Sequence, residues 1–248
     1  MNIKEFSNRF DTQINAFALN NNFGQDTSIQ NIRIDEYEKS VFLTQAQEDV
    51  ALGLYTGKNV YGESFEQTEE LRRYLAPIVE EATLSATTNS SGMPLSSKDT
   101  HAFFTLPDGS NEEQPAVWFI TFETIKISSD DCLNGNSIEV VPVRQDEYHK
   151  IKKNPFRGAN SHRALRLDLS DNVVEIISKY AIPTENSYYI RYLRKLKPIV
   201  LVNLEDMDIQ REHNETPCEL PDILHQKILD RAVLLALQSK GITTKNRE

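Results

Sequence analysis

The stretch Arg163-Ala164-Leu165-Arg166-Leu167-Asp168-Leu169 decides how the middle of this 248-residue chain folds. Its leucines alternate with Arg166 and Asp168, so that the apolar residues recur at every second position. This period is typical of a β-strand with one apolar face and one charged face. The central part of the chain is therefore predicted to form a sheet.

The same period of two extends on both sides of this stretch, from Thr100 to about Leu204. Turn residues such as Ser170-Asp171-Asn172 separate the expected strands, and no helical pattern stands between them. Strands that follow one another so closely are expected to pair as an antiparallel meander. The further strands are predicted at Ala116–Ile127, Ser137–Val143, Val173–Ser178, Tyr188–Tyr192 and Lys197–Leu204.

Helical patterns precede this region. Apolar residues spaced by three or four predict helices at Ile3–Leu19, Asp35–Tyr55 and Phe65–Ser85. Asp35 followed by Glu38 resembles a capping box at the start of the second helix. Pro77 lies within the third pattern and lacks a backbone donor, so a kink or a break is expected there. The segment Thr83–Thr100 is rich in Ser, Thr and Asn and is interpreted as a linker.

One more helix is predicted at the end of the chain. Thr216, Pro217 and Glu219 fit the cap, the first helical position and the third, and Lys240-Gly241 fits the end. The predicted fold class is therefore α+β: a helical bundle of three N-terminal helices plus the C-terminal helix, with an inserted antiparallel β lobe. The expected boundaries are 1–95 for the first helical part, 96–208 for the β lobe, and 209–248 for the returning helix and a flexible tail.

Charge is distributed unevenly along the chain. The net charge is −10, yet Arg144–Lys197 holds twelve Lys and Arg against six Asp and Glu. A basic segment in an acidic chain fits stacking against a charged partner, and an ordinary solvated surface explains it equally well. No stretch approaches the roughly 18 apolar residues of a membrane-spanning helix, so no membrane association is expected. Cys132 and Cys218 are too far apart in sequence for metal-binding spacing.

Motifs of catalysis are missing from the sequence. It has no glycine-rich phosphate loop, no GxGxxG, and no HxH or HxxxH spacing among its five histidines. His162-Arg163 is followed by Ala164, where a kinase catalytic loop would have its aspartate. The predictions are no catalytic residues, no cofactor and no metal. An enzyme with an unrecognised site stays an alternative.

Basic and aromatic residues gather between 144 and 166. Such a cluster is able to contact phosphates and stack on bases, or to contact a protein partner. Because the chain is acidic overall, a nucleic-acid-binding accessory protein is the alternative rather than the leading hypothesis. The candidates for DNA or partner contact are Lys150, Lys152, Lys153, Arg163 and Arg166.

A family resemblance rests on an ordered set of segments: Val141–Tyr148, Asn154–Arg157, Tyr188–Leu201, Cys218–His225 and Asp230–Val233. Together they resemble the head–tail connector and ring proteins of podovirus-like phages, especially crAss-like phages of gut bacteria. The resemblance covers about residues 141–240, and more faintly 30–80. It implies a virion protein, made in the host cytoplasm, that forms a homo-oligomeric, dodecameric ring. The implied partners are the portal protein, adjacent tail rings and genomic DNA in transit.

A ring subunit needs two different lateral surfaces that mate around an axis. Aromatic and arginine side chains dominate interface energetics, so they are the predicted contacts. The alternative is that two of the tyrosines and Phe156 belong to the core of the β lobe. The candidate interface residues are Tyr148, Phe156, Arg157, Tyr189, Arg191 and Tyr192.

Overall fold

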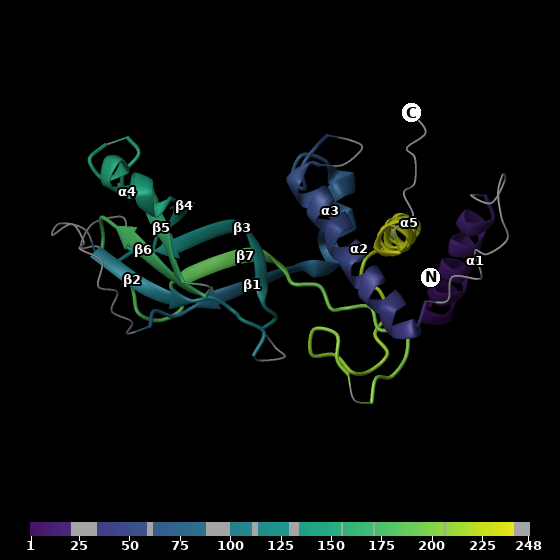
Figure 1. Cartoon of the computed structure of the whole chain (residues 1–248). Helices are drawn as coiled ribbons and strands as arrows, with labels where there is room; N and C mark the ends of the chain where they lie inside the picture. The colour runs from purple at the N-terminus through teal and green to yellow at the C-terminus, as the bar shows by residue number, and fades with distance from the viewer. Residues whose placement is uncertain are drawn as a thin grey trace. The chain divides into compact units, whose positions relative to one another are not determined.

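A computed structural model describes residues 1–20, 34–58, 62–87, 100–110, 114–128, 134–154, 156–170, 172–205 and 207–240. The chain divides into two compact units. Unit 1 comprises Met1–Ile78 and Leu196–Glu248, and unit 2 comprises Val79–Lys195 (Figure 1).

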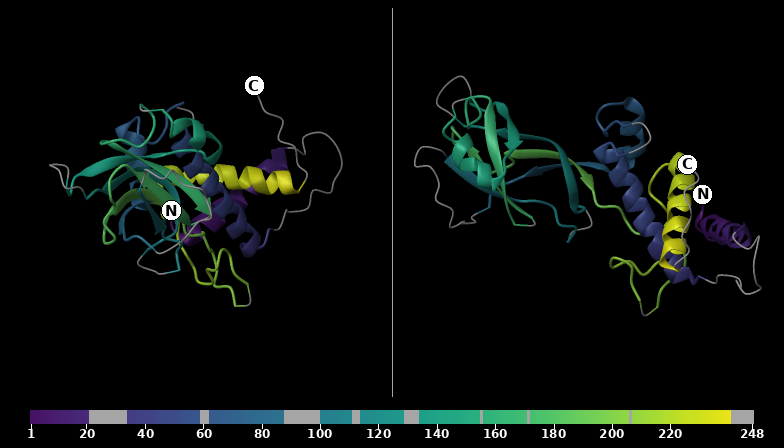
Figure 2. Two further views of the ribbon diagram at one scale, coloured as in Figure 1. Left: turned by 90° about the vertical axis from the view of Figure 1, so that its left-hand side faces the viewer. Right: turned by 45° about the horizontal axis from the view of Figure 1, so that its top comes forward.

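Unit 1 is helical. Its elements are α1 (Ile3–Asn20), α2 (Glu36–Thr56), α3 (Glu69–Leu75), the short 3-10 helix η1 (Ala76–Ile78) and α5 (Asp222–Ser239). Both α1 and α5 pack against α2, and they also contact each other (Figure 2). On α1 the buried Phe6, Phe10 and Ile14 follow at intervals of four, as a single apolar stripe requires.

Helix α2 is buried on two sides. Leu43, Ala46 and Leu54 belong to the apolar core, while Ser40 and Thr44 are buried although they are polar. These polar side chains bind an extended segment of chain: the Leu201 amide donates to Ser40 Oγ at 3.0 Å, and the Ile199 amide donates to Thr44 Oγ1 at 3.0 Å. Gln47 adds a bond to the Lys197 carbonyl at 2.9 Å.

The strand predicted at Lys197–Leu204 is therefore wrong. This segment is extended and buried, but the side chains of α2 satisfy its backbone in place of a neighbouring strand. An isolated β-bridge joins Val200 of this segment to Thr216. Thr216 was predicted to cap the last helix, and that prediction is wrong. Helix α5 begins at Asp222, with Pro221 at the cap position.

Unit 2 is a seven-stranded sheet in the order β1-β7-β3-β4-β5-β6-β2. Neighbouring strands are antiparallel except for β4 and β5, which are parallel. The strands are β1 (Val79–Leu84), β2 (Thr100–Thr105), β3 (Val117–Lys126), β4 (Ser137–Pro142), β5 (Arg163–Ser170), β6 (Val173–Ser178) and β7 (Tyr188–Arg194).

The parallel pair explains a helix that the sequence analysis missed. Consecutive parallel strands need a long crossover, which is usually helical. Helix α4 (Gln145–Ile151) lies in the crossover between β4 and β5. Tyr148 anchors this helix by packing with Leu165, Leu167 and Ile177.

The sheet curls around its own core. A bridge between Thr87 and Phe103 brings the chain just beyond β1 to the edge strand β2. The curvature is visible in both views of Figure 2. Inward-facing side chains of all seven strands form one cluster, among them Leu84, Phe104, Ile125, Val140, Ala164, Ile176 and Tyr188.

These observations overturn the predicted fold class. The chain is built on a mixed, curled seven-stranded sheet, with five α-helices in the described residues, and it is not a helical bundle with an inserted antiparallel β lobe. The third helix was predicted to run to Ser85, but Pro77 breaks it and the chain enters the sheet at Val79. The domain boundaries at 95 and 208 stay a prediction, and the two units divide the chain differently.

Candidate assembly surfaces

The most exposed aromatic side chain of unit 2 lies in the crossover between α4 and β5. Phe156 is 85% exposed. The turn beneath it is fixed, because Asn154 accepts hydrogen bonds from the Phe156 amide at 2.9 Å and from the Gly158 amide at 2.7 Å. A Cβ at Gly158 would lie only 3.0 Å from the Asn154 carbonyl oxygen, so a larger residue here would have to displace this turn slightly.

Cations lie close to Phe156 in the sequence, on both sides of it. Lys150, Lys153 and Arg157 are exposed, and Lys152 is half-buried, with its ammonium 5.3 Å from the centre of the Tyr148 ring. Half-buried Arg163 donates to the Phe156 carbonyl at 3.3 Å. We call this group the basic tip: Lys150, Lys152, Lys153, Phe156, Arg157 and Arg163.

Tyr189 and Arg191 lie on β7, which β3 and β4 separate from β5 in the sheet. Both are half-buried, and they follow at an interval of two along β7. Tyr189 lies beside Phe122, which is 50% exposed, with the ring centroids 6.3 Å apart. Arg191 stands opposite Glu81 of β1. The Tyr189–Arg191 surface thus offers an aromatic pair and a pair of opposite charges.

Tyr148 and Tyr192 are buried in the cores of unit 2. Tyr148 holds α4 on the sheet, and the Tyr192 hydroxyl donates to the Pro115 carbonyl at 3.3 Å. The burial of Tyr148 and Tyr192 fits the alternative that these tyrosines belong to the core. The structure thus brings Phe156 and Arg157 together and separates them from Tyr189 and Arg191, and the role of these residues in an interface stays a prediction.

Arg166 lies in the interior of the curled sheet. Its Nη1 is 2.8 Å from Glu123 Oε1, and the Tyr188 hydroxyl donates to Glu123 Oε2 at 2.6 Å. Asp168 lies 3.0 Å from Arg166 Nε but is not aligned for a hydrogen bond. Burial raises the pKa of Glu123 above its ordinary value, and Arg166 and Tyr188 limit that rise. Arg166 is therefore already paired with Glu123 in the interior of unit 2.

Sequence reasoning missed Glu123, although a signal was present. Glu123 occurs in the same alternation as Ile125 and Ile127, which predicts that all three face the core. A carboxylate at such a position needs a buried cation, and Arg166 is the cation that the structure supplies.

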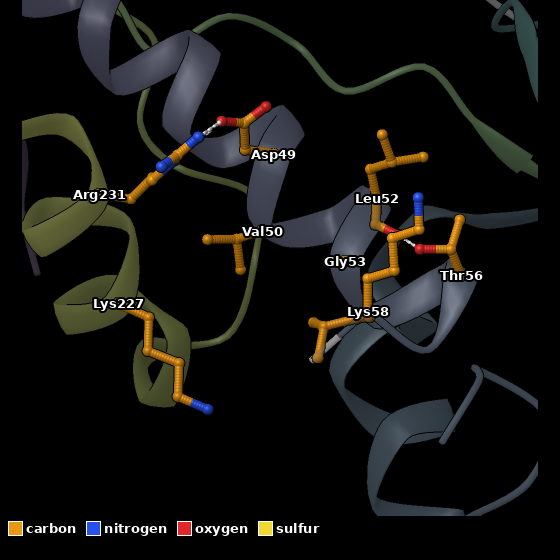
Figure 3. A pocket seen from close by; sticks show the side chains of 9 residues that line it. Asp49, Val50, Leu52, Gly53, Thr56, Lys58, Lys227 and Arg231 are labelled. Atoms are coloured by element: carbon orange, nitrogen blue, oxygen red, sulfur yellow. Dashed lines mark hydrogen bonds and ion pairs between the residues drawn. The ribbon is translucent and has the colours of Figure 1, made fainter. Parts of the chain in front are cut away.

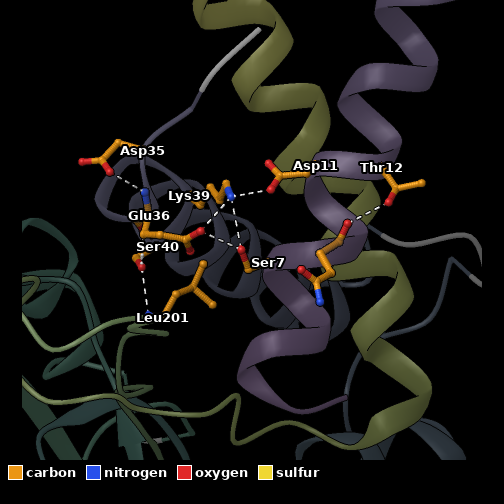
Figure 4. A network of polar contacts seen from close by, with 9 residues as sticks. Ser7, Asp11, Thr12, Asp35, Glu36, Lys39, Ser40 and Leu201 are labelled. Carbon is orange, nitrogen blue, oxygen red and sulfur yellow. Dashed lines mark hydrogen bonds and ion pairs between the residues drawn. The ribbon is translucent and has the colours of Figure 1, made fainter. Parts of the chain in front are cut away.

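A second buried charge joins two helices of unit 1. Lys39 of α2 is buried, and its ammonium donates to Ser7 Oγ at 3.1 Å, Asp11 Oδ2 at 2.8 Å and Glu36 Oε1 at 2.9 Å (Figure 4). All three of its donors are thereby satisfied. Burial lowers the pKa of Lys39, but the contacts with Asp11 and Glu36 outweigh it, so that the pKa is raised.

Reactive groups do not gather in the part of the chain that the structure describes. It holds no cluster of three His, Cys, Asp or Glu side chains suited to a metal ion. Burial raises the pKa of the Cys218 thiol to about 11, which keeps it protonated and unreactive at neutral pH. No described helix is long and apolar enough to span a bilayer.

The whole chain, residues 1–248, matches the family model described as phage tail ring protein 3/4. The chain belongs to this family. It is 43% identical to "Ring protein 3" of Bacteroides phage crAss001 over 252 residues, covering all of both chains. It is 27% identical to "Ring protein 4/5" of the same phage, covering 95% of this chain and 92% of that one.

Family membership confirms the resemblance found in the sequence. The chain is a structural ring protein of a phage tail, and its place is the virion. Neither relative bears the name of an enzyme. The basic tip and the Tyr189–Arg191 surface are therefore candidate contacts within a tail assembly.

Proposed function

We propose that this chain is a non-catalytic subunit of a closed, dodecameric ring in the connector between phage head and tail. The ring extends the channel of the portal protein, binds the adjacent tail ring and lets genomic DNA pass. The rings are assembled in the host cytoplasm before they enter the virion.

The observation that carries this proposal is the basic tip. A fixed turn presents Phe156 to solvent at 85% exposure among cations, in a chain with a net charge of −10. An exposed, preorganised aromatic side chain with a neighbouring arginine is the kind of anchor that contributes most to protein interfaces. The tip therefore fits an acidic surface with an apolar pocket on a neighbouring ring protein.

Mass measurement of an assembled particle tests the ring proposal. This chain is mixed with the portal protein of the same phage, with and without the protein of the adjacent ring, and native masses are recorded. We expect a discrete complex with twelve copies of this chain. A complex with another number of copies would overturn the dodecamer, and the absence of any complex in both mixtures would overturn the connector assignment.

Acidic residues elsewhere in the chain are assigned to the lumen of the ring. Outside Arg144–Lys197 the chain carries 15 Lys and Arg against 31 Asp and Glu. A negative wall repels the phosphates of DNA and lets the duplex slide. Once imaging of the ring identifies the lumen residues, reversing their charge should slow DNA ejection. Ejection at an unchanged rate would overturn this lining.

Direct DNA binding by the basic tip is the second candidate function, and it rests on the same cluster of cations. Phosphate contacts release counterions, so the affinity for DNA would fall steeply as salt is raised. Titration of labelled duplex at several salt concentrations distinguishes the two functions. A steep slope favours a nucleic-acid-binding role, and undetectable binding at low salt excludes it.

A further inference from the structure

Unit 1 contains an open pocket between the C-terminal half of α2 and the middle of α5 (Figure 3). Its volume is about 430 Å³. Leu52, Gly53 and Thr56 line it from α2, and Leu52 is 40% exposed. A Cβ at Gly53 would lie 3.3 Å from the Lys58 carbonyl oxygen, so glycine lets the chain beyond α2 pack closely there. The pocket is thus partly apolar and open to solvent.

Cations form the rim of this pocket. Lys58 lies beyond the end of α2, and Lys227 and Arg231 come from α5. Asp49 also lines the pocket, and Arg231 binds its carboxylate through Nε at 2.9 Å and Nη2 at 2.7 Å. The occupant that this rim favours is therefore a segment with an apolar side chain and acidic neighbours.

Unit 1 also contains a segment in which an exposed apolar side chain has acidic neighbours. The loop 202–215 exposes Met207 to 49%. Among its described residues, four carry a negative charge and one a positive charge: Glu205, Asp208, Glu212 and Glu215, and Arg211. Methionine is flexible and polarisable, so it fits apolar pockets of irregular shape. We call this segment the Met207 loop.

Hydrogen bonds connect the described residues of the Met207 loop to one another. The Leu204 amide donates to the His213 carbonyl at 2.8 Å, and Ile209 and Glu212 exchange backbone bonds of 3.1 and 3.0 Å. His213 Nδ1 lies 2.8 Å from the Met207 carbonyl. Leu204 and Ile209 fill the loop from inside together with Val200.

The loop and the pocket involve different residues of α2. Ser40 and Thr44 bind the segment that leads into the loop, whereas Asp49, Gly53 and Thr56 line the pocket. The loop also contacts α2 at Glu48, whose Oε1 accepts a hydrogen bond from Gln210 Nε2 at 2.7 Å. A subunit with two different, complementary surfaces forms head-to-tail contacts, and these contacts close into a ring when the rotation between subunits permits it.

We propose that the Met207 loop of one copy docks in the pocket between α2 and α5 of the next copy. Met207 enters beside Leu52, and the carboxylates of the loop lie against the cations of the rim. The contact is repeated around the ring, and it rests on the ring assembly proposed above. The partner of this surface is thus a second copy of this chain.

Exchange of charges tests the contact in the full chain. Leu52→Glu places a negative charge opposite the acidic loop, and Met207→Lys places a positive charge opposite the basic rim. Each variant alone should lower the yield of rings about tenfold or more, and the double variant Leu52→Glu/Met207→Lys should restore it. Both side chains are exposed, so the isolated subunit should stay folded.

The matched control is Ile223→Glu. Ile223 is 62% exposed on α5 and does not line the pocket, so this variant should form rings normally. Ring yield is measured in cells in which the variant replaces the wild-type chain, and a photo-crosslinking residue at position 52 identifies the neighbour.

The outcomes separate the contact from the ring assembly itself. We expect crosslinks from position 52 to residues 202–215 of a second copy. If rings form while the crosslinks reach another segment or another protein, the contact is overturned and the ring assembly stands. If the wild-type chain forms no ring, the ring assembly itself is overturned. Rings from both single variants at the wild-type yield would also overturn the contact.

Discussion

The guanidinium of Arg166 on β5 lies 2.8 Å from the carboxylate of Glu123 on β3, although β4 stands between these strands in the sheet. Strand β4 pairs with β3 only at Thr124–Lys126, so the first part of β3 has no ladder on that side. The Arg166 side chain spans this gap inside the sheet. The ion pair therefore connects two strands where backbone hydrogen bonds do not.

Removal of Arg166 should strongly destabilise unit 2. Arg166→Met leaves the Glu123 carboxylate buried without its cation, which should lower the free energy of unfolding by about 3–5 kcal/mol. Denaturant unfolding followed by the fluorescence of Trp118, the single tryptophan of the chain, measures this loss in unit 2.

The double variant Glu123→Gln/Arg166→Met is the control. It removes both charges, so it should recover a large part of the stability that Arg166→Met loses. A single variant as stable as the wild-type chain would contradict the role of the pair.

Lys39 is expected to hold α1 on α2. Lys39→Ala removes the shared partner of Asp11 and Glu36, so α1 should detach more readily while α2 and α5 stay packed. The expected cost is about 1–2 kcal/mol, because Asp11 and Glu36 are 48% and 39% exposed and water solvates them once Lys39 is removed. Hydrogen exchange should show faster exchange of the α1 amides. The exposed Lys4→Ala on α1 is the matched control and should change little.

The pH dependence of this contact follows from the raised pKa of Lys39. A lysine whose pKa is higher in the folded state stabilises that state fully below its unfolded pKa. This contribution is lost as pH rises through the folded pKa. The extra protection of α1 should therefore persist at neutral pH and disappear only above the ordinary lysine range. Lys39→Met should lack this alkaline transition.

Glu175 should make unit 2 less stable as pH rises above the ordinary range of a glutamate. It is fully buried on β6, neither carboxylate oxygen has a hydrogen bond, and His101 Nδ1 lies 3.4 Å away. Burial raises the pKa of Glu175, and His101 limits the rise. The folded state then retains a proton that the unfolded state releases, so stability falls as pH rises from the unfolded pKa to the folded one.

Replacement of Glu175 tests this dependence. Glu175→Leu removes a buried charge without hydrogen bonds and should raise the free energy of unfolding at neutral pH by about 1–3 kcal/mol. It should also flatten the fall in stability between mildly acidic and neutral pH. Trp118 fluorescence in denaturant series at several pH values measures both effects. An equal slope in the wild-type chain and the variant would show that Glu175 does not cause it.

The strand at Leu165–Leu169 could be predicted because alternation depends on local backbone geometry alone. Which of its faces is inside could not. The pattern indicated a charged face in solvent, but the sheet curls, so Arg166 points inward while Leu165 and Leu167 pack beneath α4. Period two fixes which residues share a face, and only the tertiary fold decides which face is covered.

Long-range pairing limited the rest of the prediction. The pattern of Leu71, Tyr74 and Ile78 continues into Val79 and Ala82, so a single helix was a reasonable expectation, yet β7 pairs with Val79–Leu84 and converts it to a strand. Pairing with a neighbouring strand overrides the local helical pattern at this point. The basic tip was visible in sequence as a run of cations, but its turn at Asn154 and the exposure of Phe156 required the structure.

Phe156 should be required for assembly and dispensable for folding. Because it is 85% exposed, Phe156→Ser should change the free energy of unfolding by less than about 0.5 kcal/mol. As an anchor in a neighbour's pocket it should contribute about 2 kcal/mol or more, so incorporation into connector particles should fall about 30-fold. Native mass spectra of mixtures with the adjacent ring protein give this ratio.

A charge variant distinguishes a protein partner from DNA at the same tip. In Lys150→Ala/Lys153→Ala/Arg157→Ala, loss of a DNA contact should reduce the salt dependence of DNA binding by about one power of salt concentration per lost phosphate contact. Lys126→Ala and Lys179→Ala remove exposed cations of unit 2 outside the tip and serve as controls. If Phe156→Ser incorporates normally while the charge variant alone abolishes DNA binding, the tip contacts nucleic acid rather than a neighbouring ring.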